Sequence, residues 1–345
     1  MKVVVCYTGG VGSQVIRLLG EHPDHELVGV LVHDRAKEGR DVGELTNTAQ
    51  IGVAATCDVD QILALRPDCA LWHGAAWDRE TVARFLRSGV NVYTGMAGFS
   101  VPLAEDEELR AACQAGGASL ASGGNIPGLI SDVLPLFLSG YTGNIRRIRA
   151  TQRNHVAEYP SAHQLHEYLM MGVPREQAEH ATAVDAIWLT AQSESAKLVA
   201  AGLGAAYGQT TISTREFALT PVEITLESSG LTVPAGTVAG VRWTFTTTTA
   251  EGYPFLDVVN EQTVALGLGA GWRQQIDEPN WTVEVDGHPS IRCQLELTAG
   301  TDQPVDSSPA LNAARAVNFI PQLVAAAPGF VSVLDMPAPR GYLAG

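Results

Sequence analysis

Three glycines lie close together near the start of the chain, directly after an apolar run. Glycines at such a place let the backbone approach a pyrophosphate, which the free N–H groups of the following helix can bind. Against the usual GxGxxG spacing, Tyr7 takes the first glycine position. An ordinary glycine-rich turn is the alternative, but the position between a strand and a helix favours a dinucleotide site. Its residues would be Thr8, Gly9, Gly10, Val11 and Gly12.

Charged residues follow the second apolar run, where a dinucleotide site holds the adenosine ribose. Asp34 is the acid expected to bind the ribose 2′-hydroxyl of NAD. Arg35 and Lys37 offer positive charge for the 2′-phosphate of NADP, and Arg40 extends this basic cluster. Lys37 and Arg40 could also be no more than solvated charges. The cofactor is therefore expected to be NADP or NAD, and these residues leave the choice open.

Small residues follow two further apolar runs. Because ligands of open α/β sheets bind beyond the carboxyl ends of the strands, such residues could line the nicotinamide and allow close approach of a substrate. A glycine-rich break at 123–128 carries an asparagine that could bond the carboxamide or act only as a turn residue. The candidates are Gly74, Ala75, Thr94, Gly95 and Asn125.

The elements that position these residues alternate between strand and helix patterns over the first 125 residues. Strands separated by helices of this length predict a parallel sheet with right-handed crossovers. Beyond the break, runs rich in β-branched residues predict a mixed, mostly antiparallel sheet. The fold class is α/β, with an N-terminal Rossmann domain and a C-terminal α+β domain.

The expected elements have the following bounds. The first half has strands over 2–7, 26–33, 53–56, 69–73 and 90–94, with helices over 13–19, 58–65, 79–88 and 105–115. The second half has strands over 145–154, 222–226, 240–249, 281–285 and 291–297, with helices over 164–171, 178–191, 194–200 and 309–327. We divide the chain into a dinucleotide-binding domain (1–125), a second domain (126–305) and a terminal helix and tail (306–345) that returns to the first domain.

Composition narrows the class of partner. The 345 residues carry a net charge of −15, which repels phosphate backbones and argues against nucleic acid. Five scattered cysteines without a CxxC pair predict neither a zinc ribbon nor a disulfide framework. Met1 and Lys2 lead straight into an apolar strand, and no run reaches the ~18 residues of a membrane helix. We expect a cytoplasmic, soluble protein without a membrane partner.

Four segments together resemble the dihydrodipicolinate-reductase-like oxidoreductases, in the branch of 2,4-diaminopentanoate dehydrogenase and the native amine dehydrogenases. The segments are VCYTGGVGSQVI, VHDRAKEGRDVGEL, GGNIPGLISDVLP and ARAVNFIPQLVAAAPG. The resemblance implies that the second domain (126–305) serves in substrate binding and dimerisation. It also implies a homodimer and an enzyme that interconverts an amine with a ketone or aldehyde and ammonia, using NAD(P)H. A small ketone, imine or amine would be its substrate.

One position departs from the amine branch, which has an essential glutamate just after the fifth strand. Gly98 stands there, and no acid appears before Glu105. A carboxylate deprotonates ammonium and stabilises the cationic iminium, so its loss favours a reductase of carbonyls or preformed imines that does not use ammonia. A dinucleotide-binding protein without catalysis is the remaining alternative.

The resemblance places the polar groups of the substrate pocket around QRNHVAEYP. His155 has an ordinary pKa near about 6.5 and could move a proton, Tyr159 could donate a hydrogen bond, and Glu158 could replace the missing carboxylate. The alternatives are that His155 is a surface residue at a strand end, that Tyr159 packs in an interface, and that Glu158 is a solvated charge. HQLHE, which contains His163 and His166, is not a metal-ligand motif, so we expect no metal site.

Overall fold

The computed structural model describes residues 1–74, 77–95, 103–276, 278–297, 308–332, 334–335 and 340–342. The chain divides into two compact units. Unit 1 comprises Met1–Gly128 together with Ser308–Gly345, and unit 2 comprises Leu129–Ser307.

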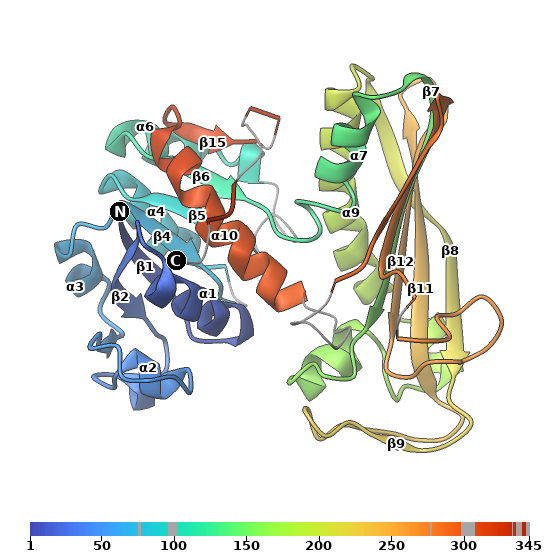
Figure 1. Cartoon of the computed structure of the whole chain (residues 1–345), viewed down its shortest axis with the longest axis horizontal. Helices are drawn as coiled ribbons and strands as arrows, with labels where there is room; N and C mark the ends of the chain where they lie inside the picture. The colour runs from blue at the N-terminus through green and yellow to red at the C-terminus, as the bar shows by residue number, and fades with distance from the viewer. Residues whose placement is uncertain are drawn as a thin grey trace. The chain divides into compact units, whose positions relative to one another are not determined.

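Unit 1 contains a parallel sheet of seven strands in the order β15-β6-β5-β4-β1-β2-β3 (Figure 1). The expected Rossmann-type sheet is thereby confirmed. Strands β6 (SLAS) and β15 (GFV) were not predicted, because neither contains a run of four apolar residues. The strands are β1 (Lys2–Cys6), β2 (Glu26–Leu31), β3 (Ala55–Thr56), β4 (Cys69–Trp72), β5 (Asn91–Thr94), β6 (Ser119–Ser122) and β15 (Gly329–Val331).

Helices cover both faces of this sheet because successive side chains of a buried strand point to opposite faces. Val3 and Val5 of β1 pack with α1 (Gly10–Glu21) and α10 (Ser308–Ala325). Val4 and Cys6 pack with α4 (Arg79–Arg87) and α6 (Glu107–Gly116) on the other face. The terminal helix α10 lies beside α1 (Figure 1), although its residues follow unit 2 in the sequence. The remaining helices of unit 1 are α2 (Val42–Leu45), α3 (Val59–Ala64), η1 (Arg35–Lys37) and η2 (Leu103–Glu105).

Unit 2 is built on a six-stranded sheet in the order β14-β13-β7-β12-β11-β8. Only β7 and β12 pair in parallel among these strands, so the predicted mixed, mostly antiparallel sheet is confirmed. Strands β8 and β12 were not predicted. The six strands are β7 (Gly143–His155), β8 (Tyr207–Leu219), β11 (Val238–Thr249), β12 (Pro254–Thr263), β13 (Trp281–His288) and β14 (Ile291–Leu295), and β9 (Ile224–Thr225) with β10 (Thr232–Val233) forms a separate hairpin.

Helices α7 (Val133–Ser139) and α9 (Thr182–Gly202) pack on one face of this sheet (Figure 1). The prediction of separate helices over 178–191 and 194–200 was wrong, because α9 is continuous and no glycine or proline interrupts it before Gly202. The short α8 (Arg175–Glu179) precedes it, and Gln164–Tyr168 forms a π-helical turn. None of the helices described is long and apolar enough to cross a membrane.

Candidate functional site

The glycine-rich turn of unit 1 has a left-handed residue where the GxGxxG pattern has its first glycine. Tyr7 has φ +78°, a conformation that costs a side-chain-bearing residue about 1–2 kcal/mol. Its N–H donates to the carbonyl of Leu31 (2.7 Å), and its ring packs edge-on against Trp72 (centroids 5.1 Å apart). The substitution of tyrosine for glycine therefore retains the backbone conformation that the motif requires.

The other two glycines of the motif meet different demands. A Cβ added to Gly12 would lie 2.1 Å from the carbonyl oxygen of Tyr7, so helix α1 can approach β1 only with glycine there. Around Gly9 and Gly10 an added Cβ would meet nothing within 4 Å. Gly9 is the N-cap of α1 and has no side-chain capping bond. The open backbone and the uncapped N–H groups of α1 fit a pyrophosphate.

The charged residues after β2 have different local partners. Asp34 accepts a bond from the N–H of Ala36 (2.9 Å) through one carboxylate oxygen and so starts the short helix η1. The Lys37 ammonium donates to the Thr8 hydroxyl (2.9 Å), which brings a positive charge to the glycine-rich turn. Arg40 instead pairs with Glu44 (2.7 Å), so the structure joins only Lys37 of this pair directly to the turn.

The ends of β4, β5 and β6 bring further candidates to the same edge of the sheet. Thr94 is fully buried, and Gly74 and Gly95 follow β4 and β5. Asn125 is 7% exposed, and its Oδ1 is buried without a hydrogen-bond partner. Ala75 and Gly98 lie outside the described residues.

One residue at this edge was missed by the sequence prediction. His73 follows β4, is 9% exposed and has a buried Nε2 without a partner. Its place at the end of an expected strand was the only available signal, and that place does not reveal burial. Among the described residues of unit 1, His73, Asn125 and Asn312 thus present orphaned polar atoms near the edge where a nucleotide would bind.

In unit 2, the proposed proton-transfer residues lie at and just beyond the end of β7. His155 ends this strand, and its Nδ1 is buried without a partner. Burial lowers the pKa of His155, and the nearby Arg273 guanidinium lowers it further, whereas Glu158 acts in the opposite direction. Glu158 is exposed and accepts a bond from the Ser228 hydroxyl (2.8 Å). Tyr159 is partly buried.

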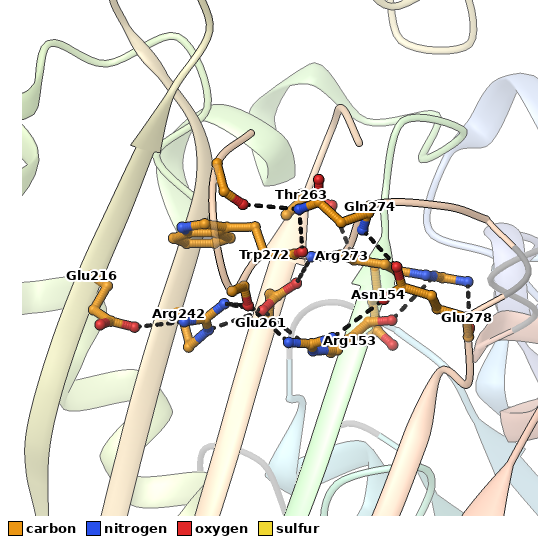
Figure 2. Close-up of polar contacts among 12 residues, drawn as sticks. Arg153, Asn154, Glu216, Arg242, Glu261, Thr263, Trp272, Arg273, Gln274 and Glu278 are labelled. Carbon is orange, nitrogen blue, oxygen red and sulfur yellow. Dashed lines mark hydrogen bonds and ion pairs between the residues drawn. The ribbon is translucent and has the colours of Figure 1, made fainter. Parts of the chain in front are cut away.

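A buried carboxylate anchors the loop that precedes β13. Glu261 of β12 is 1% exposed, and Arg242 of β11 donates to its Oε2 from Nε (2.9 Å) and Nη2 (2.6 Å). The backbone N–H of Arg273 donates to the other oxygen (3.0 Å). Figure 2 shows Glu261 at the centre of these contacts, with Arg153 beside it. The pairing compensates the cost of burying a carboxylate and ties the loop to two strands.

The Arg273 side chain is held by the loop itself. It is 1% exposed and donates to the backbone carbonyls of Arg153 (3.2 Å), Gln275 (3.2 Å) and Glu278 (3.1 Å). Arg242 also packs over the Trp272 ring, 4.4 Å from its centroid. These bonds hold in place the cation that, after burial, is the second cause of the lowered pKa of His155.

Two histidines in and after the HQLHE segment have backbone partners. His166 Nδ1 contacts the carbonyl of Met171 (2.9 Å), and His180 Nδ1 contacts that of Glu176 (2.7 Å). Over the described part of the chain, no group of three or more histidine, cysteine, aspartate or glutamate side chains is arranged to hold a metal ion.

Both parts of the chain match known families. Residues 1–119 match the family described as dihydrodipicolinate reductase, N-terminus. Residues 129–345 match the family described as 2,4-diaminopentanoate dehydrogenase C-terminal domain. An amine dehydrogenase of Streptomyces virginiae is 28% identical over 350 residues, which cover 98% of this chain and 96% of that protein.

Solved structures show the same fold at lower identity. An amine dehydrogenase from Mycobacterium smegmatis superposes with a TM-score of 0.79 at 21% identity, covering 99% of this chain and 97% of that one. The protein GenD2 from gentamicin A biosynthesis, solved in complex with NAD, has a TM-score of 0.55 at 17% identity and covers 99% and 88%. The resemblance of the sequence motifs is thereby confirmed: the chain belongs to the 2,4-diaminopentanoate dehydrogenase family, carries a dihydrodipicolinate-reductase-type N-terminal domain, and is an NAD(P)-dependent oxidoreductase.

Proposed function

We propose that the protein is an amine dehydrogenase that catalyses the reversible, NAD(P)H-dependent reductive amination of a small ketone or aldehyde. The similarity to the Streptomyces amine dehydrogenase carries this proposal, because it spans almost the full length of both proteins. In this reaction the carbonyl compound condenses with ammonia to an imine and water, and the imine then takes up a hydride and a proton.

Unit 1 holds the dinucleotide in this proposal. The pyrophosphate binds the Gly9 and Gly10 backbone and the uncapped N-terminus of α1, where open space and N–H donors coincide. Lys37, through its contact with Thr8, adds positive charge to the same turn. When bound, the cofactor supplies the hydride or accepts it. Gly74, Ala75, Thr94, Gly95 and Asn125 would line the nicotinamide.

Unit 2 supplies the groups that handle the proton. Because the pKa of His155 is lowered, its imidazole is neutral at pH 7 and above and can accept a proton. This protonation state suits the oxidation of an amine, which releases a proton. Tyr159 would donate a hydrogen bond to the reacting oxygen or nitrogen, and Glu158 would be a second acid or base. Rate should therefore rise with pH through the pKa of His155 in the direction of amine oxidation.

A second function is favoured by one observation in the sequence. The family resemblance places Gly98 roughly at the position of a glutamate in the amine branch, and the segment 94–102 contains no acidic residue. If no other carboxylate replaces it, the enzyme would reduce carbonyls or preformed imines without ammonia.

The two functions differ in their need for ammonium. We would incubate the protein with NADH or NADPH and a panel of ketones and aldehydes that includes cyclohexanone, with and without ammonium chloride, and identify products by gas chromatography. Amine formed only with ammonium supports the amine dehydrogenase, whereas alcohol formed equally well without it supports the carbonyl reductase.

A matched pair of variants ties any activity to the glycine-rich turn. A Cβ added at position 9 meets no atom within 4 Å, and an Asp there can cap α1, yet it puts a negative charge beside the pyrophosphate. Gly9→Asp should abolish turnover without lowering the melting temperature, and the neutral Gly9→Asn should retain more activity. Equal turnover by both variants and the unmodified protein would place the activity elsewhere.

A further inference from the structure

The edge of the unit 1 sheet around His73 has a well-defined geometry. His73 directly follows β4, and its N–H donates to the carbonyl of Cys6 on the neighbouring β1 (3.2 Å). A Cβ added to Gly12 would lie 3.9 Å from the Cβ of His73, and one added to Gly95 would lie 3.7 Å from its Nδ1. The imidazole therefore lies between the start of α1 and the end of β5.

The imidazole has hydrogen-bonding capacity that the described protein atoms do not use. Its Nε2 is buried without a partner, and His73 as a whole is only 9% exposed, so solvent does not replace that partner. Buried polar atoms in folded proteins almost always have partners, so an orphan of this kind indicates a missing ligand or water.

A second orphan lies close by along the same edge. A Cβ added to Gly124 would lie 3.7 Å from the carbonyl oxygen of Gly95, and the next residue is Asn125, whose Oδ1 is also buried without a partner. These unused polar atoms lie beyond the ends of β4 and β6, the two neighbours of β5, and provide hydrogen-bonding groups for a polar, uncharged molecule.

The order of the strands assigns this set to one half of the dinucleotide. In a doubly wound sheet, the pyrophosphate binds the turn after β1 and the adenosine binds beside β2. Strands β4, β5 and β6 continue from β1 on the opposite side from β2. We propose that His73 is a binding residue for the nicotinamide riboside half of the cofactor and hydrogen-bonds a ribose hydroxyl or the carboxamide.

The protonation state of His73 suits this role. Burial lowers the pKa of His73 to about 4, so the imidazole is neutral at pH 7 and has one N–H donor and one lone pair. A cationic imidazole at this place would repel the positively charged ring of the oxidised cofactor. The inference rests on dinucleotide binding and holds for a carbonyl reductase as well as for an amine dehydrogenase.

Binding measurements with two probes test the inference without turnover. His73→Phe keeps a planar ring but removes both nitrogens. We expect it to weaken NADH and NADPH binding by about 3- to 10-fold, the equivalent of one hydrogen bond. Binding of ADP, which lacks the nicotinamide riboside, should not change. Both would be measured by isothermal titration calorimetry.

His25 offers a matched control in the same unit. It is 7% exposed and its Nδ1 is buried without a partner, but it precedes β2 and so lies at the amino end of the sheet. His25→Phe should leave the affinity for all three nucleotides unchanged. If His73→Phe binds NADH and NADPH as tightly as the unmodified protein, or loses ADP binding equally, the inference is wrong.

A second measurement needs no substitution at His73. In protein labelled with ¹⁵N-histidine, NADH or NADPH should shift the His73 Nε2 resonance, and ADP should leave it in place. A resonance that responds to neither reduced cofactor would overturn the assignment, even if the His73 variant fails to fold.

Discussion

Lys37 and Arg40 are two cations of one short segment, and they contact different partners, so we expect different roles for them. Lys37 reaches Thr8 in the glycine-rich turn, whereas Arg40 pairs with Glu44 one helical turn along the chain. Of these two, Lys37 is the one placed to add charge at a nucleotide phosphate. Sequence pattern could propose the basic cluster, but it could not separate these two, since the Lys37–Thr8 contact joins residues 29 positions apart.

We therefore expect Lys37→Met to weaken NADPH binding by about 10-fold, the scale of a lost charge-assisted hydrogen bond, and NADH binding less. Arg40→Met is the matched control and should change neither. Fluorescence titrations with both cofactors measure the difference. An equal loss for NADH and NADPH would show that Lys37 does not distinguish the 2′-phosphate.

His73 also has a consequence for stability. The pKa of a histidine in an unfolded chain is about 6.5, whereas burial lowers the pKa of His73 to about 4. The unfolded state therefore binds the proton first as pH falls, so the contribution of His73 to stability is complete above about pH 6.5 and is lost as pH falls to about 4. The loss is on the order of 3 kcal/mol.

Urea unfolding at pH 7 and pH 4.5 checks this expectation. His73→Phe should lose less free energy of unfolding between the two pH values than the unmodified protein does. If both lose the same amount, His73 does not carry the acid sensitivity.

At the scale of the element, helix α1 contains one glycine that has no room for a side chain and another that has ample room. An alanine at position 12 would bring its Cβ to 2.1 Å from the Tyr7 carbonyl, whereas one at position 20, in the same helix, would meet nothing within 4 Å. Gly12→Ala should destabilise the protein by about 1–3 kcal/mol through overpacking. Gly20→Ala should stabilise it by up to about 1 kcal/mol through helix propensity. Thermal unfolding of both variants measures the contrast, and similar melting temperatures would argue against close packing of α1 on β1.

The loop before β13 depends in the same way on one buried carboxylate. Glu261 is 1% exposed between Arg242 and the backbone of Arg273, whereas the Glu284–Arg292 pair of the same sheet is largely exposed. Glu261→Gln should cost about 1–3 kcal/mol, because it removes the charge that accepts bonds from Arg242 and from the backbone of Arg273, although Arg242 keeps its pairing with Glu216 (2.8 Å). Glu284→Gln should cost less than about 1 kcal/mol. Chemical denaturation measures the free energy of unfolding of both variants. Equal losses for Glu261→Gln and Glu284→Gln would show that Glu261 does not anchor the loop.

Particular strands show which elements a sequence pattern can predict. The first five parallel strands are compact apolar runs between turn residues, and they were predicted correctly. Strand β12 is buried along almost its whole length between β7 and β11, so its sequence has no alternation of polar and apolar residues. Strand β8 lies at the sheet edge and is polar on much of both faces. Neither has the pattern that identifies a strand.

At the scale of the whole molecule, chain order and spatial order differ. Helix α10 and strand β15 come last in the sequence, yet they pack and pair within unit 1. The helix was recognisable from its pattern, but the three-residue β15 was not. The site was predictable to a similar extent: the glycine-rich turn has a local motif, whereas the burial of His73 and the proximity of Arg273 to His155 depend on distant parts of the chain.

The homodimer implied by the family resemblance is a prediction at the same scale. Sedimentation velocity at micromolar concentration tests it. A single species of twice the chain mass is expected, and a single species of the chain mass would contradict it.

The central claim is that the enzyme makes an amine from a carbonyl compound and ammonia: the two condense to an imine, and hydride transfer from NAD(P)H reduces its C=N bond. The most direct test is incubation with reduced cofactor, a ketone substrate and ¹⁵N-ammonium, followed by mass spectrometry of the product. We expect an amine that carries the ¹⁵N label and forms in step with cofactor oxidation. Cofactor oxidation that yields alcohol, with no label in any product, would contradict it.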